Sequence, residues 1–310
     1  MKIAPALALC AALAAPTFAA SPAGDNDWKR DSSWKKEDDA WRARAEQSLA
    51  KDNGWLTLAG RYVMKPGVNT FGTGAANDIV FPPGLGPERM GTVTVPAAGV
   101  PGKVTVKLAP GLEMTQEGIP MTDKVMDTSE GAHDWVAMGR ASFYVIEHDG
   151  RYVLRLADSQ SPVRAHFGGR VWYPVKPGYR VTARFVPYDP PRTLPIVNVI
   201  DEVSDEPSPG YVEFTMHGKK ERLDVVGNDD DGLFIVFRDA TAGKTTYGPG
   251  RFLFIDRKPK AGETFALDLN RAYNPPCAFS EFTTCPLPPR QNILKTAVEA
   301  GEKYPPRKKG

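Results

Sequence analysis

The chain has 310 residues, of which 41% are hydrophobic, and a formal net charge of +2 at pH 7. A charge this close to neutral leaves no electrostatic footprint for nucleic acid, and the length is sufficient for one large β domain or two small ones. The 29 glycines and 29 prolines lie between short apolar runs rather than in repeats, a distribution that predicts many short strands joined by turns.

The first twenty residues have the features of an export signal. Lys2 supplies the charged end, residues 3–15 are apolar, and small residues surround positions 17–20. The apolar run is too short to cross a bilayer, and no later segment is apolar enough to do so. We therefore expect residues 1–20 to be removed, leaving a periplasmic or secreted protein without a membrane span.

A helix and a β module follow the signal. Apolar residues from Trp34 to Leu49 recur at helical spacing, which predicts a helix over residues 33–52. Short alternating runs separated by Gly and Pro then continue to about Asp127 and predict antiparallel strands. Residues 21–127 are therefore expected to form an N-terminal helix plus a β module.

Residues 128–310 are predicted to form a larger β region, which either continues the first module or is a second domain. The runs LFIVF (233–237) and RFLFI (251–255) are apolar on both faces, as expected for strands that are buried on both sides. A C-terminal helix is predicted over residues 289–300. The predicted fold class is mainly β, with antiparallel sandwich-like layers and a helix near each end.

Cys277 and Cys285 are the only cysteines after the signal. In an exported protein such a closely spaced pair is most simply a disulfide, which would stabilise the fold by roughly 2 to 3 kcal/mol in the chain-entropy model. A nucleophilic or redox role would need a CxxC spacing or a partner histidine, and zinc would need further ligands. We therefore predict a disulfide and no metal or cofactor.

The candidate functional residues lie close to these cysteines in the sequence. In FALDLN, strand periodicity places Asp268 and Asn270 on one face, and Asn274 is held extended by the proline that follows it. Together with Tyr247 and Arg251 they are expected to line a polar groove in which Asp268 serves as acid or base. The alternative is that these side chains hydrogen-bond the loop backbone and pair with neighbouring arginines.

Three parts of the chain are distinctive, namely NGWLTLAGRYVMKPGVNTFGTGAANDIVFP, LRLADSQSPVRAHFGG, and FRDATAGKTTYGPGRFLF with LNRAYNPPCAFSEFTTCPLPPRQN. These segments resemble the bacterial family known as domain of unknown function 1684. The NPPCAF and TCPLPP motifs are the most specific part of the resemblance. It extends over nearly all of the predicted mature chain, but it implies no activity and no catalytic residues.

A weaker similarity links PGVNTFGTGAANDIVFP to forkhead-associated domains, which are β-sandwiches that read phosphothreonine. Thr73 stands where that family has an arginine, and no SRxH or NGT motif follows. The similarity therefore implies a sandwich more than a phosphopeptide site, because a shared fold does not carry function by itself.

Three functions are compatible with these features. The first is a binding or structural protein of the periplasm or cell envelope, whose partner is a small molecule or an envelope component held near the Asn-Pro-Pro-Cys loop. The second is a hydrolase that acts on an envelope-derived small molecule or glycan through Asp268. The third is recognition of a phosphopeptide by the N-terminal module.

Overall fold

The computed structural model describes residues 33–97, 103–129, 134–148, 150–227 and 232–304, which are mainly β. The chain divides into two compact units. The small unit consists of Ser48–Gly168 with Ser280–Thr283, and the large unit contains the remaining residues. The predicted signal, residues 1–20, lies outside the described residues.

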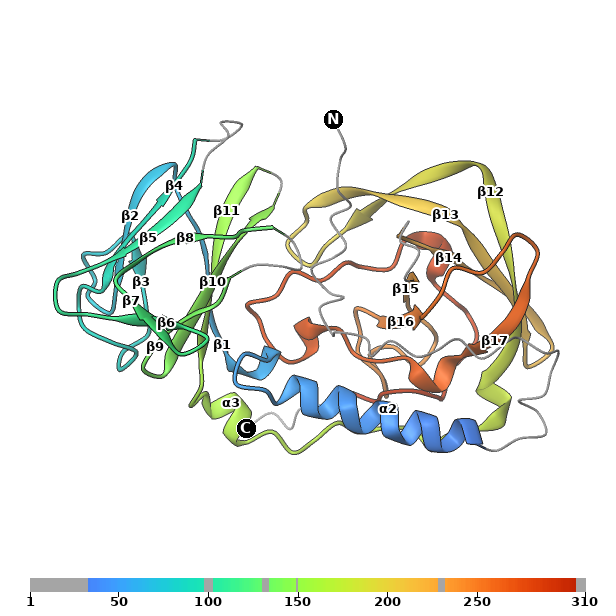
Figure 1. The fold of residues 1–310 in the computed structure, drawn as a ribbon. Coiled ribbons are helices and arrows are strands. Elements are labelled where there is room, and N and C mark those ends of the chain that lie inside the picture. Colours follow the sequence, from blue (N-terminus) through green and yellow to red (C-terminus); the bar gives the residue numbers. More distant parts are fainter. Residues whose placement is uncertain (1–32, 98–102, 130–133, 149, 228–231, 305–310) are drawn as a thin grey trace. The chain divides into compact units, whose positions relative to one another are not determined.

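Two sheets build the small unit (Figure 1). The six-stranded sheet has the order β1 (Leu58–Val63), β11 (Arg151–Asp158), β10 (Ala141–His148), β9 (Val136–Met138), β6 (Met114–Gln116), β7 (Ile119–Met121). The five-stranded sheet has the order β3 (Ile79–Val80), β2 (Gly67–Gly72), β4 (Gly91–Val95), β5 (Val104–Leu108), β8 (Asp123–Met126). The β2–β3 pair is parallel, and the other pairs are antiparallel. The short helices are η2 (Trp55–Thr57) and α3 (Pro162–Ala165).

One hydrophobic core serves both sheets of the small unit. Strands β4 and β5 bury every second residue, the pattern of a sheet with one face inward. The rings of Phe71 on β2 and Phe143 on β10 have centroids 5.5 Å apart within this core. Strands β9, β10 and β11 follow the boundary predicted at residue 127, yet they complete the sheet that begins with β1.

The large unit contains most of helix α2 (Ser33–Leu49) and a four-stranded antiparallel sheet. The sheet has the order β14 (Lys219–Val225), β13 (Val203–Met216), β12 (Arg180–Val197), β17 (Thr264–Asp268). A separate ribbon pairs β15 (Leu233–Phe237) with β16 (Arg251–Ile255). The short 3-10 helices are η3 (Pro177–Tyr179), η4 (Leu269–Arg271), η5 (Pro276–Ala278) and η6 (Arg290–Asn292).

The core of the large unit lies between the sheet and the ribbon. Val181, Ala183 and Phe185 of β12 are buried in this core, while the residues between them face the other side of the sheet. Every residue of β15 is buried, as predicted for a strand covered on both faces. Helix α2 confirms the helix predicted from the spacing of its apolar residues.

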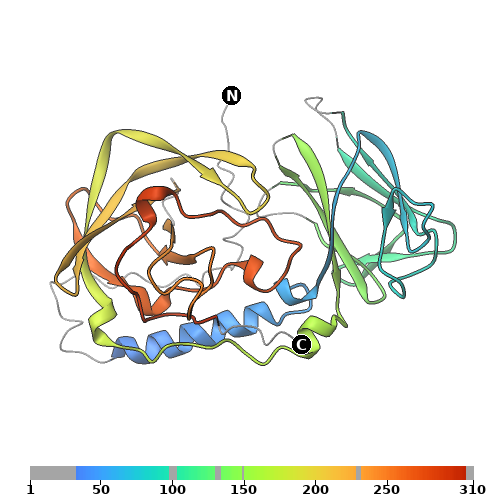
Figure 2. The ribbon, with the colours of Figure 1, turned by 180° about the vertical axis from the view of Figure 1, so that it is seen from behind.

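The predicted C-terminal helix is wrong. Residues 289–300 contain only the short turn η6, and the chain after β17, red in Figure 2, has no long helix in its described part. The backbone bonds elsewhere, because the N–H of Leu294 donates to the Arg238 carbonyl at 2.8 Å. The Arg251 guanidinium donates hydrogen bonds to the carbonyl of Val298, at 2.9 Å, and to the carbonyl of Ala300. Tertiary hydrogen bonds therefore override the local helical pattern.

Candidate functional site

Two of the predicted site residues, Asn270 and Asn274, are buried and bonded to backbone. The Asn270 amide donates to the Lys176 carbonyl and accepts from the Lys176 N–H, each at 3.0 Å. The Asn274 amide donates to the Lys303 carbonyl at 3.0 Å. These amides brace the loops on either side of them, as in the alternative that the sequence analysis left open.

Arg251 and Tyr247 likewise hold the chain together. Arg251 pairs with Asp239 at 2.8 Å, and each of these side chains is 1% exposed. The Tyr247 hydroxyl donates to the Cys277 carbonyl at 3.1 Å. Tyr247 and Arg251 are thus bonded to Cys277 and Asp239, whereas Asp268 is bonded to Arg180 and Asn270.

Asp268 ends strand β17 and caps helix η4. Its Oδ1 accepts from the backbone N–H of Asn270 at 3.0 Å and from the Asn270 amide at 2.9 Å. Its Oδ2 accepts from Nη1 of Arg180 at 2.9 Å. The Asp268 carboxylate thus has three donors around it, and through its bond to Nη1 it holds Arg180 in place.

Asp38 of helix α2 lies next to Asp268 and is not among the predicted site residues. Asp38 is fully buried, and its Oδ1 accepts from Nε of Arg271 at 2.6 Å. Its Oδ2 receives no hydrogen bond from any residue that the structure describes. Burial and the negative charge of Asp268 raise the pKa of Asp38 to about 6, against the opposing effect of Arg271. The sequence could have indicated Asp38, because it places this carboxylate on the apolar face of the helix that begins near Trp34.

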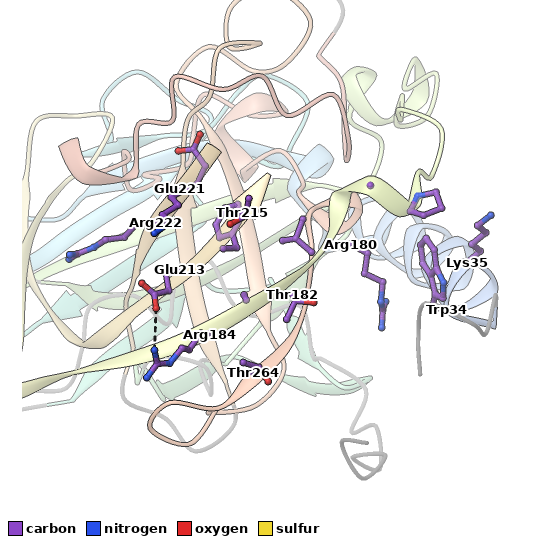
Figure 3. Close-up of a pocket in the computed structure, with 16 residues that line it drawn as sticks. Trp34, Lys35, Arg180, Thr182, Arg184, Glu213, Thr215, Glu221, Arg222 and Thr264 are labelled. Atoms are coloured by element: carbon purple, nitrogen blue, oxygen red, sulfur yellow. Dashed lines mark ion pairs between the residues drawn. The ribbon is translucent and has the colours of Figure 1, made fainter. Parts of the chain in front are cut away.

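A groove of about 1050 Å³ crosses the face of the four-stranded sheet that points away from the core (Figure 3). Its side chains come from alternate positions of the strands, as expected for one face of a sheet. The first turn of α2 and helix η3 contribute its remaining wall. The charged residues of the lining are Lys35, Arg180, Arg184, Lys220, Arg222, Glu213 and Glu221.

Two of these arginines are fixed by both a carboxylate and an aromatic ring. Arg180, bonded to Asp268, has its guanidinium carbon 5.3 Å from the centre of the Trp34 ring. Arg222 bonds Asp224 at 2.8 Å, and its guanidinium carbon lies 3.7 Å from the centre of the Tyr211 ring. Such cation–π contacts hold a guanidinium plane in a defined orientation. Each of these two arginines of the groove therefore has a carboxylate and an aromatic ring as neighbours.

Arg184 and Glu213 form an exposed pair in the groove. Arg184 and Glu213 approach to 3.7 Å, as the dashed line in Figure 3 marks, with side chains 58% and 46% exposed. Cross-strand pairing sets this contact, because Arg184 of β12 is the register partner of Glu213 on β13. Exposed pairs of this kind contribute at most about 1 kcal/mol to stability. Arg184 can therefore turn toward a ligand at little cost.

The predicted disulfide is absent. The backbone N–H of Cys277 donates to Sγ of Cys285 at 3.2 Å, and the two cysteines do not form a disulfide. Both residues belong to an apolar cluster that also includes Phe252 and Tyr273.

Within the described ranges, no three His, Cys, Asp or Glu side chains gather in a way that could hold a metal. The same ranges contain no helix with the length and apolar character of a membrane span.

The loops that invite comparison with forkhead-associated domains use their polar groups internally. The Thr73 hydroxyl donates to the Gly86 carbonyl at 3.1 Å. The Asn77 amide donates to the carbonyls of Gly74 and Glu88, each at 2.7 Å. These donors hold the two loops to each other, which leaves no support here for phosphopeptide recognition.

A family model described as "Protein of unknown function (DUF1684)" matches residues 165–303, which include all four strands of the groove. An uncharacterised protein of Haloarcula marismortui, solved by NMR in solution, is 32% identical to this chain. The similarity covers 45% of this chain and 78% of that protein, with a TM-score of 0.39. No curated protein matches the chain. The matched residues contain the NPPCAF and TCPLPP motifs, and the family description does not name bacteria.

Proposed function

Since this chain belongs to the DUF1684 family, whose description names no activity, we propose a function from its own residues. The protein is an exported binding protein that takes an anionic small molecule in the groove of the large unit. The small unit, with its two sheets arranged as a sandwich, is a structural support. The groove replaces the loop near Asn274 as the binding region, because the amide nitrogens of Asn270 and Asn274 already donate to backbone carbonyls.

The observation that carries this proposal is the anchoring of Arg180 and Arg222. Ordering a long cationic side chain on binding costs about 0.5 to 1.5 kcal/mol, and these two are already ordered by Asp268, Asp224 and their aromatic neighbours. Arginine also presents paired donors that match carboxylate, phosphate or sulfate oxygens. Two prearranged arginines in one groove favour a ligand with two or more anionic groups.

The charge of the lining supports the same ligand class. Five cationic side chains face two acidic ones, an excess of three positive charges. The buried carboxylates of Asp224 and Asp268 reduce that excess to one. The remaining field arises from exposed lysines and Arg184, so we expect binding that weakens as salt screens these charges.

Charge removal in the groove tests the proposal. We expect Arg184→Gln with Lys220→Gln to weaken the binding of sucrose octasulfate at least tenfold, about 1.4 kcal/mol. Isothermal titration calorimetry measures this affinity, with uncharged sucrose as the ligand control. The matched variant is Arg89→Gln with Lys107→Gln, which removes the same charge from exposed positions of the small unit. Equal losses in both double variants, or no binding by the wild type, would contradict an anion site in the groove.

The contact between Asp38 and Asp268 favours a second candidate, a hydrolase in which one carboxyl holds a proton and the other is ionised. Such a division is how paired carboxylates act as acid and base. The Asp268 side chain is only 8% exposed, below Arg180, so substrate access would require Arg180 to move. We expect no turnover of ester or glycoside substrates by the wild type above that of Asp268→Asn. Turnover that disappears in a folded Asp268→Asn variant would instead establish the hydrolase.

A further inference from the structure

We propose that anion binding in the groove is coupled to proton uptake by the buried carboxyl pair of Asp38 and Asp268, with Arg180 as the link. The inference rests on the proposed function, since it describes how the same groove responds to pH. It adds a regulated property, namely tighter capture of the anion in mildly acidic surroundings.

Arg180 is the residue that joins the two regions. Its side chain lines the groove and is 17% exposed, while its Nη1 bonds Oδ2 of the buried Asp268. One guanidinium therefore neutralises Asp268 and also faces the ligand. An anion bound to Arg180 places negative charge close to Asp268 and weakens that neutralisation.

The carboxyl pair has a place ready for a proton. Asp268 already accepts three hydrogen bonds, whereas Oδ2 of Asp38 accepts none from the described residues although it is buried. A buried oxygen without a donor is costly. A proton on Asp38 removes this cost and lets the Asp38 carboxyl donate to Asp268. Uptake of one proton is thus the response that the geometry favours.

The charged groups around Asp38 determine how readily it takes up a proton. From its own helix, Asp38 interacts with Arg42, and from η4 it accepts the hydrogen bond of Arg271. From β17 it faces Asp268, which is in turn bonded to Arg180 of β12. The more distant contributors are Asp39 and Glu302, which act on Arg42, and Asp256 and Glu37, which act on Arg271, Glu37 from 3.8 Å.

The direction of the coupling follows from these charges. The pKa of Asp38 is already raised to about 6 in the free protein, and an anion nearby raises it further because negative charge disfavours the ionised carboxyl. The protonated protein then binds the anion more tightly. Affinity is therefore expected to increase as pH falls from 8 to 5, by roughly three- to tenfold if the anion shifts this pKa by up to about one unit.

Calorimetry with sucrose octasulfate measures the proton directly, because its sulfate esters stay ionised between pH 5 and 8. At pH 6.5, titrations in two buffers of different ionisation enthalpy are expected to show uptake of a fraction of one proton in the wild type. Asp38→Asn should bind with no uptake and with an affinity that does not change with pH. The matched variant Glu37→Gln, on the same helix but with a side chain 60% exposed, should retain the uptake.

The outcomes separate the two proposals. Binding by the wild type without proton uptake would overturn the coupling and leave the anion site standing, whereas no binding at all would remove the site itself. If Asp38→Asn does not fold, infrared difference spectra of the wild type decide the matter. Addition of sucrose octasulfate at pH 6.5 should produce the C=O stretch of a protonated carboxyl, and an unchanged spectrum would overturn the coupling.

Discussion

Replacement of Arg251 by methionine is expected to destabilise the large unit by about 3 to 5 kcal/mol, the usual cost of breaking a buried ion pair by removing one partner. The change leaves Asp239 as an uncompensated charge, with a side chain that is 1% exposed. It also removes the donors to the carbonyls of Val298 and Ala300. Because those bonds stand in for a helix, we expect residues 294–302 to detach early and to become sensitive to protease.

The measurement is urea unfolding of the wild type and of Arg251→Met, combined with limited proteolysis in the absence of denaturant. The matched control is Arg257→Met, which breaks the more exposed pair with Glu263 and is expected to change stability by less than about 1 kcal/mol. A stable Arg251→Met variant that had lost only sucrose octasulfate binding would show that Arg251 is a ligand residue after all, as the sequence alone suggested.

Local periodicity explains why parts of the fold could be predicted. The alternation in VTVKL and the helical spacing from Trp34 to Leu49 each describe a surface with one buried face, and β5 and α2 have that form. The segment 289–300 also has helical spacing, but Ile293 is exposed and Val298 is buried against the core. Its conformation depends on Arg251, which lies far away in the sequence, so no local pattern could reveal it.

The candidate site shows the same limit at the level of single residues. Strand parity places Asp268 and Asn270 on one face only if the strand continues, but β17 ends at Asp268 and the 3-10 turn begins at Leu269. The Asp268 carboxylate itself caps that turn, which directs Asn270 to the backbone of Lys176. Asp268, the predicted acid or base, is therefore the residue that turns Asn270 away from the face on which strand periodicity placed it.

The groove could not be predicted because its residues are assembled by strand pairing. Arg184 is opposite both Glu213 and Thr264, and Arg222 is opposite Glu213 on the next strand. Sequence patterns indicate that such strands exist, but they do not state which strands are neighbours or in which register. Asp38 could have been identified from the sequence, since a carboxylate on the apolar face of a helix needs a buried partner.

Replacement of Asp38 by asparagine is expected to alter the pH dependence of stability by on the order of 2 to 3 kcal/mol. The pKa of Asp38 is about 6 in the folded protein against an ordinary value of 3.8, and one pKa unit corresponds to about 1.4 kcal/mol. Below pH 3.8 the carboxyl is protonated in both states. Between these values the unfolded chain releases its proton first, so the contribution of Asp38 to stability is lost as pH rises through 6.

Comparison of the two proteins at each pH isolates this contribution, because the carboxylates with lowered pKa values, such as Asp78 and Asp158, titrate equally in both. Asparagine also loses the ion pair with Arg271, but that loss is a nearly constant offset above pH 6. We therefore expect the wild type to lose stability relative to Asp38→Asn between about pH 4 and 6.5, measured by urea unfolding. A difference that stays flat over this range would mean that Asp38 is ionised throughout, and a carboxyl pair that holds no proton at pH 5 could not supply the pH response of the groove.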